Sequence, residues 1–526
     1  MIMRVARALV CCSFLLATAA CSSFRLDPNG PVTPDEFRQH VLMFDARGEP
    51  RDPLGAHASL IAEDTPSGGG QGPTFDAYIE NILAGIKAHR DKYGSARIIF
   101  FFHGGLNSRS AALQRAQEQI AAMKEPVEKG GRPDLYPIFV NWQTSLYASY
   151  KDHLLFVTKG QDTYRDGVFL APFKFASDVS RAVFEIVPDN HLAIRDLARH
   201  LTYVREGATQ ASGCALTQLD FREGTTRERS FANRFTDKLG AFTTYLLTKW
   251  WMTGVIDGGG TPAWSSMIYT SDRLFFSDQE MHHSYAFRDR EPSGAGDFSH
   301  FLRALASQPK GLQQGDEIIL AAHSAGAIVA NAMLQHFGEV LPITTLVYMA
   351  PACTIDELMT GGRVANFLAG GKPGTPRRQL YLLTLHEVSE LSERHFIDLT
   401  PRGSLLVWLD QYIQPKNSEF RGHMMGRARN LRLHAHLIPC AIQPQIHITA
   451  FSEQPQFAAG AGPAYPEPQT HGSFGAVPYW RGKEVWQPVS ADLRLICFSD
   501  DPKKSRDPEK QGHAGAGSSP PCIGKP

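Results

Sequence analysis

The chain has 526 residues; 43% of them are hydrophobic, 20% are charged, and 53 basic residues balance 53 acidic ones. This composition is typical of a globular protein with a large core, and it excludes a disordered chain, a collagen-like repeat and a membrane protein with many spans. Since the formal net charge is zero, nothing indicates a nucleic-acid partner, which would need a basic surface. The length allows two or three domains, or one large domain with insertions.

The N-terminus has the pattern of an export signal, which we assign to residues 1–21. Two arginines precede an apolar stretch at 8–20 that is too short to cross a bilayer comfortably. Small residues then lead to Cys21, a pattern that resembles the lipobox of bacterial lipoproteins, although Thr18 stands where that family usually has leucine. The resemblance implies a lipid on Cys21 that anchors the chain in the bacterial envelope, and Ser22 implies the outer membrane, facing the periplasm. An ordinary cleaved signal is the alternative.

The cysteines allow disulfides but do not indicate their pairing. Of the eight, two lie in the signal and Cys21 would carry lipid. Five remain, and because five is odd at least one stays unpaired within the chain. Their spacing is too wide for a zinc motif. The five are Cys214, Cys353, Cys440, Cys497 and Cys522.

After a polar segment at 22–38, expected to act as a tether, buried strands alternate with helical stretches. Apolar residues recur at helical spacing from Phe75 onward, with Thr74 as the N-cap. RIIFFF at 97–102 is a continuous apolar run of the kind that is buried on both faces of a sheet. This alternation predicts an α/β fold with a mostly parallel sheet and helices on both faces. Other strands are expected at 40–45, 136–142, 317–322, 345–349, 380–385 and 446–451, and a helix at 109–123.

One interval breaks the alternation, because 173 residues separate Trp142 from Asp316, far more than one crossover helix needs. We therefore expect a large inserted cap or lid. Its apolar patches form either its own core, or an apolar substrate groove or membrane-facing surface. The patches lie at 154–157, 168–175 and 242–256. The predicted organisation after the tether is a first part of the core at 39–142, the cap at 143–315, a second part of the core at 316–499 and a disordered tail at 500–526.

The strongest motif is AHSAG at 322–326, which resembles the G-x-S-x-G nucleophile elbow with alanine in the first position. Small residues are needed on both sides of the serine because the chain turns sharply from strand to helix and strains the serine. An apolar strand precedes Ser324 and a helix of small residues follows it, as the motif requires. We expect Ser324 to be a nucleophile beside the positive end of that helix. The alternative is a serine that only caps the helix.

A second motif, HGGLN at 103–107, ends the RIIFFF strand and resembles the oxyanion loop of lipases and esterases. Glycines let the backbone approach a substrate closely and leave N–H groups free to meet a developing oxyanion. We expect the loop of Gly104, Gly105 and Leu106 to supply such donors, from Gly105 or Leu106, together with the N–H of Ala325. The alternative is a plain Gly-Gly turn.

Neighbours of this loop have two interpretations. His103 is expected to be structural and to hold the loop through hydrogen bonds. Asn141, Trp142 and Tyr150 follow a strand whose end should lie near the site. They either line the pocket or pack the cap against the sheet.

These segments together resemble the α/β-hydrolase fold in its serine-hydrolase branch, and among its members a group of bacterial lipoprotein-type α/β-hydrolase-domain proteins. The stretches that carry the resemblance are FFHGGLNS, VNWQTSLYASYKDH and AAHSAG. It covers roughly 95–145 and 315–480, and not the insertion. In that fold the catalytic serine, acid and histidine follow one another in this order along the chain. The resemblance therefore implies an acid after the strand at 380–385 and a histidine after the strand at 446–451.

The resemblance leaves two glutamates in competition for the acid. Glu390 lies several residues into the loop, where the fold usually places its acid, and is preferred to Glu387; Asp398 and Asp410 are more distant alternatives. His471 is the only histidine between the last strand and the tail, in a loop rich in glycine and serine. We expect it to be the catalytic histidine.

The sequence thus predicts a membrane-anchored serine hydrolase that cleaves carboxylic esters, with a lipid-like or hydrophobic ester as substrate. An amidase, peptidase or acyltransferase with the same nucleophile is the first alternative, because a fold does not determine its chemistry. A non-catalytic envelope binding module on a hydrolase scaffold is the second. No cofactor and no metal are implied, and the oligomeric state is not indicated.

Overall fold

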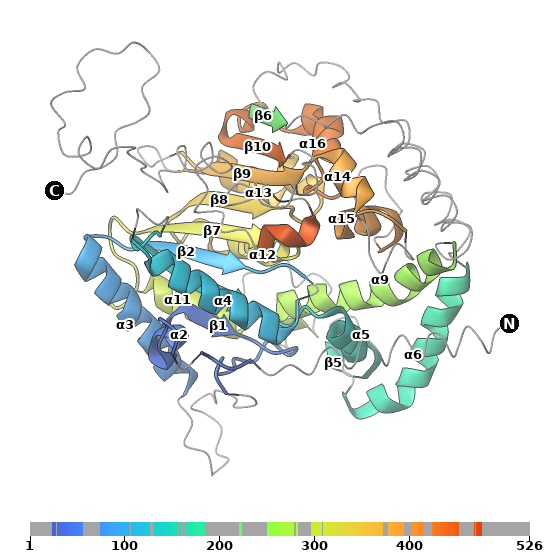
Figure 1. Ribbon diagram of the computed structural model, residues 1–526, viewed down its shortest axis with the longest axis horizontal. Coiled ribbons are helices and arrows are strands. Elements are labelled where there is room, and N and C mark those ends of the chain that lie inside the picture. The colour runs from blue at the N-terminus through green and yellow to red at the C-terminus, as the bar shows by residue number, and fades with distance from the viewer. Residues whose placement is uncertain are drawn as a thin grey trace.

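The computed structural model of the chain shows a parallel β-sheet with helices packed on both faces (Figure 1). The predicted signal with Cys21, the loop residue Leu106, Asp398 and the tail at 500–526 lie outside the described residues. The structure describes residues 24–27, 29–55, 74–105, 107–126, 131–155, 157–158, 161–162, 164–184, 220–223, 250–277, 280–281, 296–307, 309–371, 377–393, 401–413, 423–451, 468 and 470–475.

Eight strands form the sheet in the order β1-β3-β2-β7-β8-β9-β10-β6, and every neighbouring pair is parallel. The predicted α/β fold class is therefore confirmed, and each predicted strand is found within two residues of its expected bounds. The strands are β1 Val41–Met43, β2 Arg97–Phe102, β3 Leu135–Asn141, β6 Asp220–Glu223, β7 Glu317–His323, β8 Ile343–Met349, β9 Gln379–Leu385 and β10 Ile446–Phe451.

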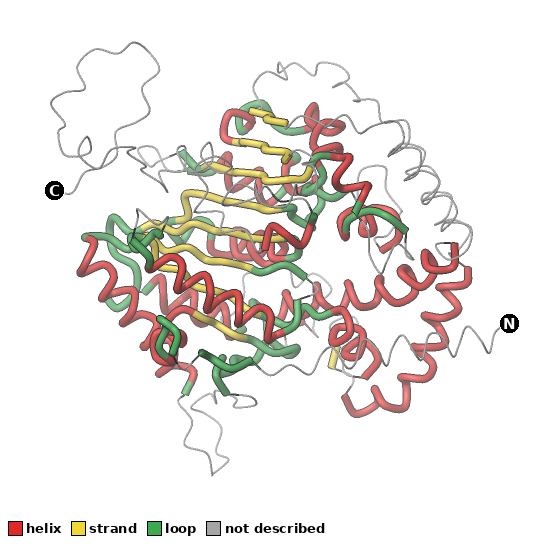
Figure 2. Tube along the Cα trace, in the orientation of Figure 1, coloured by secondary structure: helices red, strands yellow, loops and turns green. Residues whose placement is uncertain are grey.

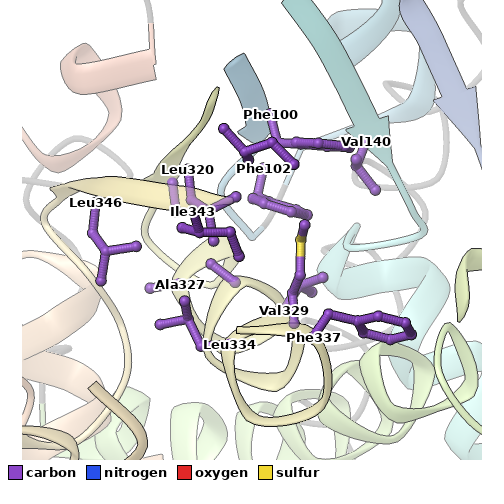
Figure 3. Close-up of a cluster of buried hydrophobic side chains, with 14 of the residues drawn as sticks. Phe100, Phe102, Val140, Leu320, Ala327, Val329, Leu334, Phe337, Ile343 and Leu346 are labelled. Atoms are coloured by element: carbon purple, nitrogen blue, oxygen red, sulfur yellow. The ribbon is translucent and has the colours of Figure 1, made fainter. Parts of the chain in front are cut away.

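Alternation along each strand creates two cores, one on each face of the sheet. In β2, Ile98, Phe100 and Phe102 face one core, and Ile99 and Phe101 face the other. In Figure 3 the first core gathers side chains of β2, β3, β7 and β8 against α12. The helices on that face are α3 Phe75–Tyr93, α11 Asp297–Ala306, α12 Gly326–Phe337, α13 Arg363–Ala369 and α16 Ala428–His434. The opposite face carries α2 Pro34–His40, α4 Arg109–Lys124, α9 Trp250–Arg273, α15 Leu405–Trp408, the π-helix η7 Leu409–Ile413 and the 3-10 helix η10 His471–Gly475.

Local sequence signals explain where these helices begin and end. The side chain of Thr74 accepts a hydrogen bond from the Ala77 N–H and caps α3, as predicted. Gly94 ends the same helix with a φ of 85°, a conformation that glycine adopts at little cost. Ser108 caps α4 in the same way through the Ala111 N–H. Short elements complete the fold, namely α14 Glu387–Ser392 and the 3-10 helices η5 Ile355–Leu358, η8 Ala435–Leu437 and η9 Gln443–Gln445.

The interval at 143–315 is not a separate insertion throughout. Its helices α5 Leu146–Leu155, α6 Tyr164–Phe184 and α9 lie beside the sheet and contact one another (Figure 2), with a two-stranded ribbon of β4 Val157–Thr158 and β5 Gln161–Asp162. However, β6 pairs with β10 at the edge of the main sheet, and α11 packs on the core. Pairing with β6 gives this edge of β10 its hydrogen-bond partners, so part of the interval expected as the cap contributes to the sheet.

The segment at 22–38, expected to be a tether, is partly folded. It contains most of α2, and the ring of Phe24 stacks on that of Phe37, which is buried in the core. The folded body therefore begins three residues after Cys21. Among the described residues, no helix combines the length and apolar character needed to cross a bilayer. Of the cysteines, Cys353 is free and buried, and Cys440 forms a disulfide.

Candidate active site

Ser324 occupies a strained turn between β7 and α12. Its φ is 52°, in the left-handed region that residues with side chains rarely adopt. Two hydrogen bonds hold the turn: the Ser324 N–H donates to the Met349 carbonyl, and the Ala352 N–H donates to the Ser324 carbonyl, both at 2.9 Å. A Cβ at Gly326 would collide with the carbonyl oxygen of Phe102. The small residues of the motif are thus explained by the close passage of β2.

His471 lies beside Ser324 although 147 residues separate them in sequence. Its Nε2 is 2.8 Å from the Ser324 Oγ, and both residues are buried. This is the geometry in which an imidazole can accept a hydroxyl proton. The structure therefore brings together the predicted nucleophile and the predicted base.

His323, which the sequence analysis treated only as a spacer in the motif, holds the histidine loop. Its Nε2 is 3.0 Å from the carbonyl oxygen of His471, and the two rings are 5.2 Å apart. Because a carbonyl only accepts hydrogen bonds, Nε2 of His323 carries a proton and donates it. Burial lowers the pKa of His323 well below its usual value, so the ring is neutral. The residue before the serine thus helps to position the residue that faces the serine.

The two glutamates predicted as the acid contact other side chains of the protein. Glu387 belongs to a buried ion-pair network in which Arg427 contacts both Glu387 at 2.7 Å and Asp410 at 2.8 Å. Glu390 is completely buried and accepts a hydrogen bond from the Ser404 hydroxyl. Burial raises the pKa of Glu390 to about 8, against the effect of the Ser404 hydrogen bond. At neutral pH Glu390 is therefore mostly an uncharged acid.

Glu393, which the sequence analysis did not consider, contacts the histidine directly. Its Oε2 accepts a hydrogen bond of 2.9 Å from the backbone N–H of His471. Its charge also contributes to raising the pKa of Glu390. The spacing of Glu387, Glu390 and Glu393 contained a usable signal, because residues three apart follow one another along one side of a helix.

The glycine loop lies directly against the turn that holds Ser324. A Cβ on Gly104 would lie 2.5 Å from the His323 Nδ1 and 3.0 Å from the Ser324 Cβ. A Cβ on Gly105 would lie 3.3 Å from the Ala325 Cβ and 3.2 Å from the Met267 sulfur of α9. Glycine is required at Gly104 because no larger residue fits between the loop and the elbow.

One carbonyl in this loop is held by three donors. The Gly104 oxygen lies 2.9 Å from the His103 Nδ1 and accepts hydrogen bonds from Asn107 Nδ2 at 2.7 Å and Thr144 Oγ1 at 3.4 Å. Since C=O and N–H point in opposite directions across a trans peptide, these contacts turn the Gly105 N–H away from all three donors. The loop peptide is therefore fixed in this orientation.

The tautomer of His103 follows from its contacts. The Trp142 N–H donates to His103 Nε2 at 3.3 Å, so the ring proton resides on Nδ1 and is donated to the Gly104 carbonyl. Burial lowers the pKa of His103 to about 4, which keeps this neutral form at physiological pH. Trp142 also stacks on the His103 ring at 4.5 Å. Trp142 thus supports the loop, while Tyr150 packs in the insertion through a hydrogen bond to Asp178.

In comparisons with known proteins, no protein-family model, curated protein or solved structure matched the chain. The architecture, a parallel sheet with helices on both faces, is compatible with the α/β-hydrolase fold. Within the described part of the chain, no three histidine, cysteine or acidic side chains gather closely enough to hold a metal ion.

Proposed function

We propose that the protein is a serine hydrolase that cleaves carboxylic esters. The observation that carries the proposal is the 2.8 Å contact between His471 Nε2 and Ser324 Oγ, made at a serine whose φ is 52°. A serine that merely caps a helix needs neither a strained backbone nor a histidine at its hydroxyl.

The proposed reaction begins with attack of the Ser324 oxygen on the ester carbonyl carbon. His471 accepts the hydroxyl proton and returns it to the leaving alcohol, which departs as the acyl-enzyme forms. Water then attacks the acyl-enzyme, with His471 again taking a proton and returning it to the Ser324 oxygen as the carboxylic acid leaves. Without a nearby base the serine hydroxyl would be a weak nucleophile at neutral pH.

We assign the triad acid to Glu393 rather than to Glu390. The acid must be ionised so that it can orient the imidazole and stabilise its charged form. Glu390, with a pKa of about 8, is mostly uncharged at neutral pH, whereas Glu393 already contacts the backbone N–H of His471. The order of serine, acid and histidine along the chain is kept by this assignment.

The oxyanion is proposed to be bound by the N–H groups of Gly105 and Ala325. The first is aimed by the three donors on the Gly104 carbonyl, and the second lies at the N-terminus of α12, where backbone donors are free. Such donors act without reorganisation when charge develops, and losing one typically costs about 100- to 1,000-fold in rate. Met267 beside Gly105 gives this part of the site an apolar wall, which suits an apolar acyl group.

A fluorophosphonate probe, which reacts with activated serines, tests the proposal. We expect the wild-type chain to be labelled, and Ser324→Ala and His471→Ala to lose labelling by at least about 1,000-fold. Ser265→Ala, at an exposed serine of α9, and His300→Ala, at a surface histidine, are the matched controls and should label normally. Failure of the folded wild type to react would overturn the hydrolase proposal. Parallel ester and amide substrates then distinguish an esterase from an amidase or peptidase.

The assignment of the acid has its own test. Glu393→Gln should lower kcat by about 1,000- to 10,000-fold, the size expected when the imidazole loses its orienting carboxylate. Glu390→Gln replaces a mostly neutral acid by a neutral amide, so kcat at pH 7 should change by less than about tenfold. The reverse result would return the role to Glu390, as the sequence alone suggested.

We also propose that the chain is exported and anchored in the bacterial envelope through a lipid on Cys21. The support is the lipobox-like sequence before this cysteine, which lies outside the described residues. Metabolic labelling with a radioactive fatty acid should mark the wild-type chain and not Cys21→Ala. If the wild-type chain takes up no label, the lipid anchor is rejected and the alternative, an ordinary cleaved signal, is favoured.

A further inference from the structure

Helix α6 presents its apolar side chains to solvent. Of the large hydrophobic residues described as exposed, seven belong to this helix, among them Phe169 at 79%, Phe173 at 74% and Phe184 at 80% exposure. The others are Leu170, Phe175, Val179 and Val183. A phenylalanine side chain covers on the order of 150 to 250 Å², so the patch reaches several hundred Å², which in soluble proteins usually marks an interaction surface.

Three polar side chains of α6, those of Lys174, Asp178 and Arg181, contact the neighbouring helices of the protein. Lys174 donates to the His153 carbonyl of α5 at 3.0 Å, and the Tyr150 hydroxyl of α5 donates to Asp178 at 2.9 Å. Arg181 forms an ion pair of 3.1 Å with Asp257 of α9, whose side chain is 1% exposed. The usual amphipathic arrangement of a surface helix is therefore inverted.

Close packing fixes this orientation. A Cβ on Gly258 of α9 would lie 2.6 Å from the Ala182 Cβ and 2.7 Å from the Asp178 carbonyl oxygen of α6. The backbones of the two helices can approach this closely only because position 258 has no side chain. Rotating α6 to bury its phenylalanines would break the ion pair and drive large rings against α9. The packing of α6 against α9 therefore keeps the apolar face of α6 exposed.

We propose that this face, defined by Phe169, Phe173, Phe175, Val183 and Phe184, docks on the surface of a lipid bilayer. Apolar helix faces of this kind enter the boundary between headgroups and acyl chains, and their affinity increases with the apolar area that they bury. In the described stretch 169–184 the acidic residue Asp178 points inward, while Arg181 remains half-exposed beside the patch. In this stretch the apolar face therefore presents no carboxylate that an anionic membrane would repel.

The start of the folded body favours a membrane as the occupant. Phe24 already stacks on Phe37 of α2, so no more than about 11 Å of extended chain separates it from Cys21, the predicted lipid attachment point. A lipid there would hold the body directly against the bilayer instead of at the end of a long tether. In Figure 1, α2 and α6 both lie toward the β1 edge of the sheet, away from β6. The start of the folded body and α6 therefore lie toward the same edge of the sheet.

Helix α9 connects this surface to the proposed active site. Asp257 and Gly258 near its start contact α6, and Met267 three turns later packs against Gly105 of the glycine loop. Helix α9 therefore contacts both the proposed docking helix and the loop beside the reacting serine. A substrate dissolved in the membrane would thus lie close to the helix that borders the proposed active site. Docking itself does not depend on hydrolysis, so the two proposals can fail separately.

Vesicle flotation tests the docking proposal without the lipid anchor. The chain from Ser22, which contains every described element, is mixed with vesicles of phosphatidylethanolamine and phosphatidylglycerol, and its bound fraction is measured. We expect the triple variant Phe169→Ser, Phe173→Ser, Phe184→Ser to lose at least about tenfold in partition coefficient. Val340→Ser, at an apolar residue that is 65% exposed and lies between α12 and β8, outside α6, is the control and should bind as wild type.

Each outcome has a defined meaning. Wild-type binding that the triple variant loses supports the proposal, provided that the variant retains the melting temperature of the wild type. Binding by the triple variant equal to wild type, or no binding of wild type, overturns it. Concentration-dependent dimers that the triple variant abolishes would also overturn it and identify a second copy as the occupant. Ser324→Ala should float like wild type, which separates docking from catalysis.

Discussion

Helices α3 and α6 have similar lengths, 19 and 21 residues, but bury opposite kinds of side chain. In α3, apolar residues such as Ile79, Ile82 and Ile86 pack into the core, and the ion pair of Lys87 with Asp91 lies in solvent. In α6, the charged residues face the protein and the phenylalanines face outward. Burial of apolar area drives the first arrangement. For the second, we propose that a lipid bilayer covers the exposed apolar side chains.

The largest expected difference between the two helices concerns their apolar residues. Ile82→Ser in α3 removes a fully buried side chain and introduces an unpartnered hydroxyl, so it should destabilise the fold by about 4 kcal/mol. Phe173→Ser in α6 should change the free energy of unfolding by less than about 0.5 kcal/mol. Urea denaturation measures both. An equal loss in the two variants would contradict the inverted orientation of α6.

A second prediction concerns the buried carboxyl group of Glu390. Among the described residues, no cation lies within hydrogen-bonding distance of this carboxyl group. Folding raises the pKa of Glu390 to about 8, so the folded state binds its proton more tightly than the unfolded chain. Stability from this group is present at low pH and is lost as pH rises from the unfolded value toward 8. Between pH 5 and 8 the loss is roughly 3 kcal/mol.

The control for this prediction is Glu390→Gln, which cannot ionise. Its unfolding free energy, measured beside wild type from pH 5 to 8, should fall less steeply as pH rises. Parallel curves for the two proteins would mean that Glu390 is ionised in the folded state, and would reopen its candidacy as the triad acid.

The smallest expected effect compares the ion pairs of the two helices. Asp257→Ala leaves Arg181 without its buried partner at the contact of α6 with α9, and should cost about 2 kcal/mol. Lys87→Ala on the exposed side of α3 should cost less than about 0.5 kcal/mol, as surface pairs usually do. Thermal unfolding at low and high salt checks both values. A larger cost for Lys87→Ala than for Asp257→Ala would remove the basis for calling α6 inverted.

Much of the fold could be predicted because its signals are local. The runs RIIFFF and EIILAA are recognisable as buried strands, and Thr74 and the glycines mark helix ends. The elbow around Ser324 was also visible, since small residues, a strand and a helix stand next to one another in sequence. The boundaries of the insertion were harder, because β6 joins the sheet through pairing with a strand more than 200 residues later.

Part of the candidate site could also be predicted, because some of its signals are local in sequence. Ser324 and the glycine loop follow from local motifs, and His471 follows from its position after the last strand. The choice between Glu390 and Glu393 depends on which carboxyl is desolvated and which reaches the backbone of His471. Burial and contact across 78 residues of sequence cannot be read from spacing alone.

The amino-acid sequence by itself determined the parallel α/β class, the elbow that strains Ser324 and the glycines that let the loop approach it, because periodicity and side-chain size act between near neighbours in the chain. Only the tertiary structure decided that His323 holds His471, that Glu390 is buried as a mostly neutral acid, and that the phenylalanines of α6 face outward. The physical reason is that desolvation and the direction of a helix face are set by what packs against a residue. That packing comes from segments far away in the sequence.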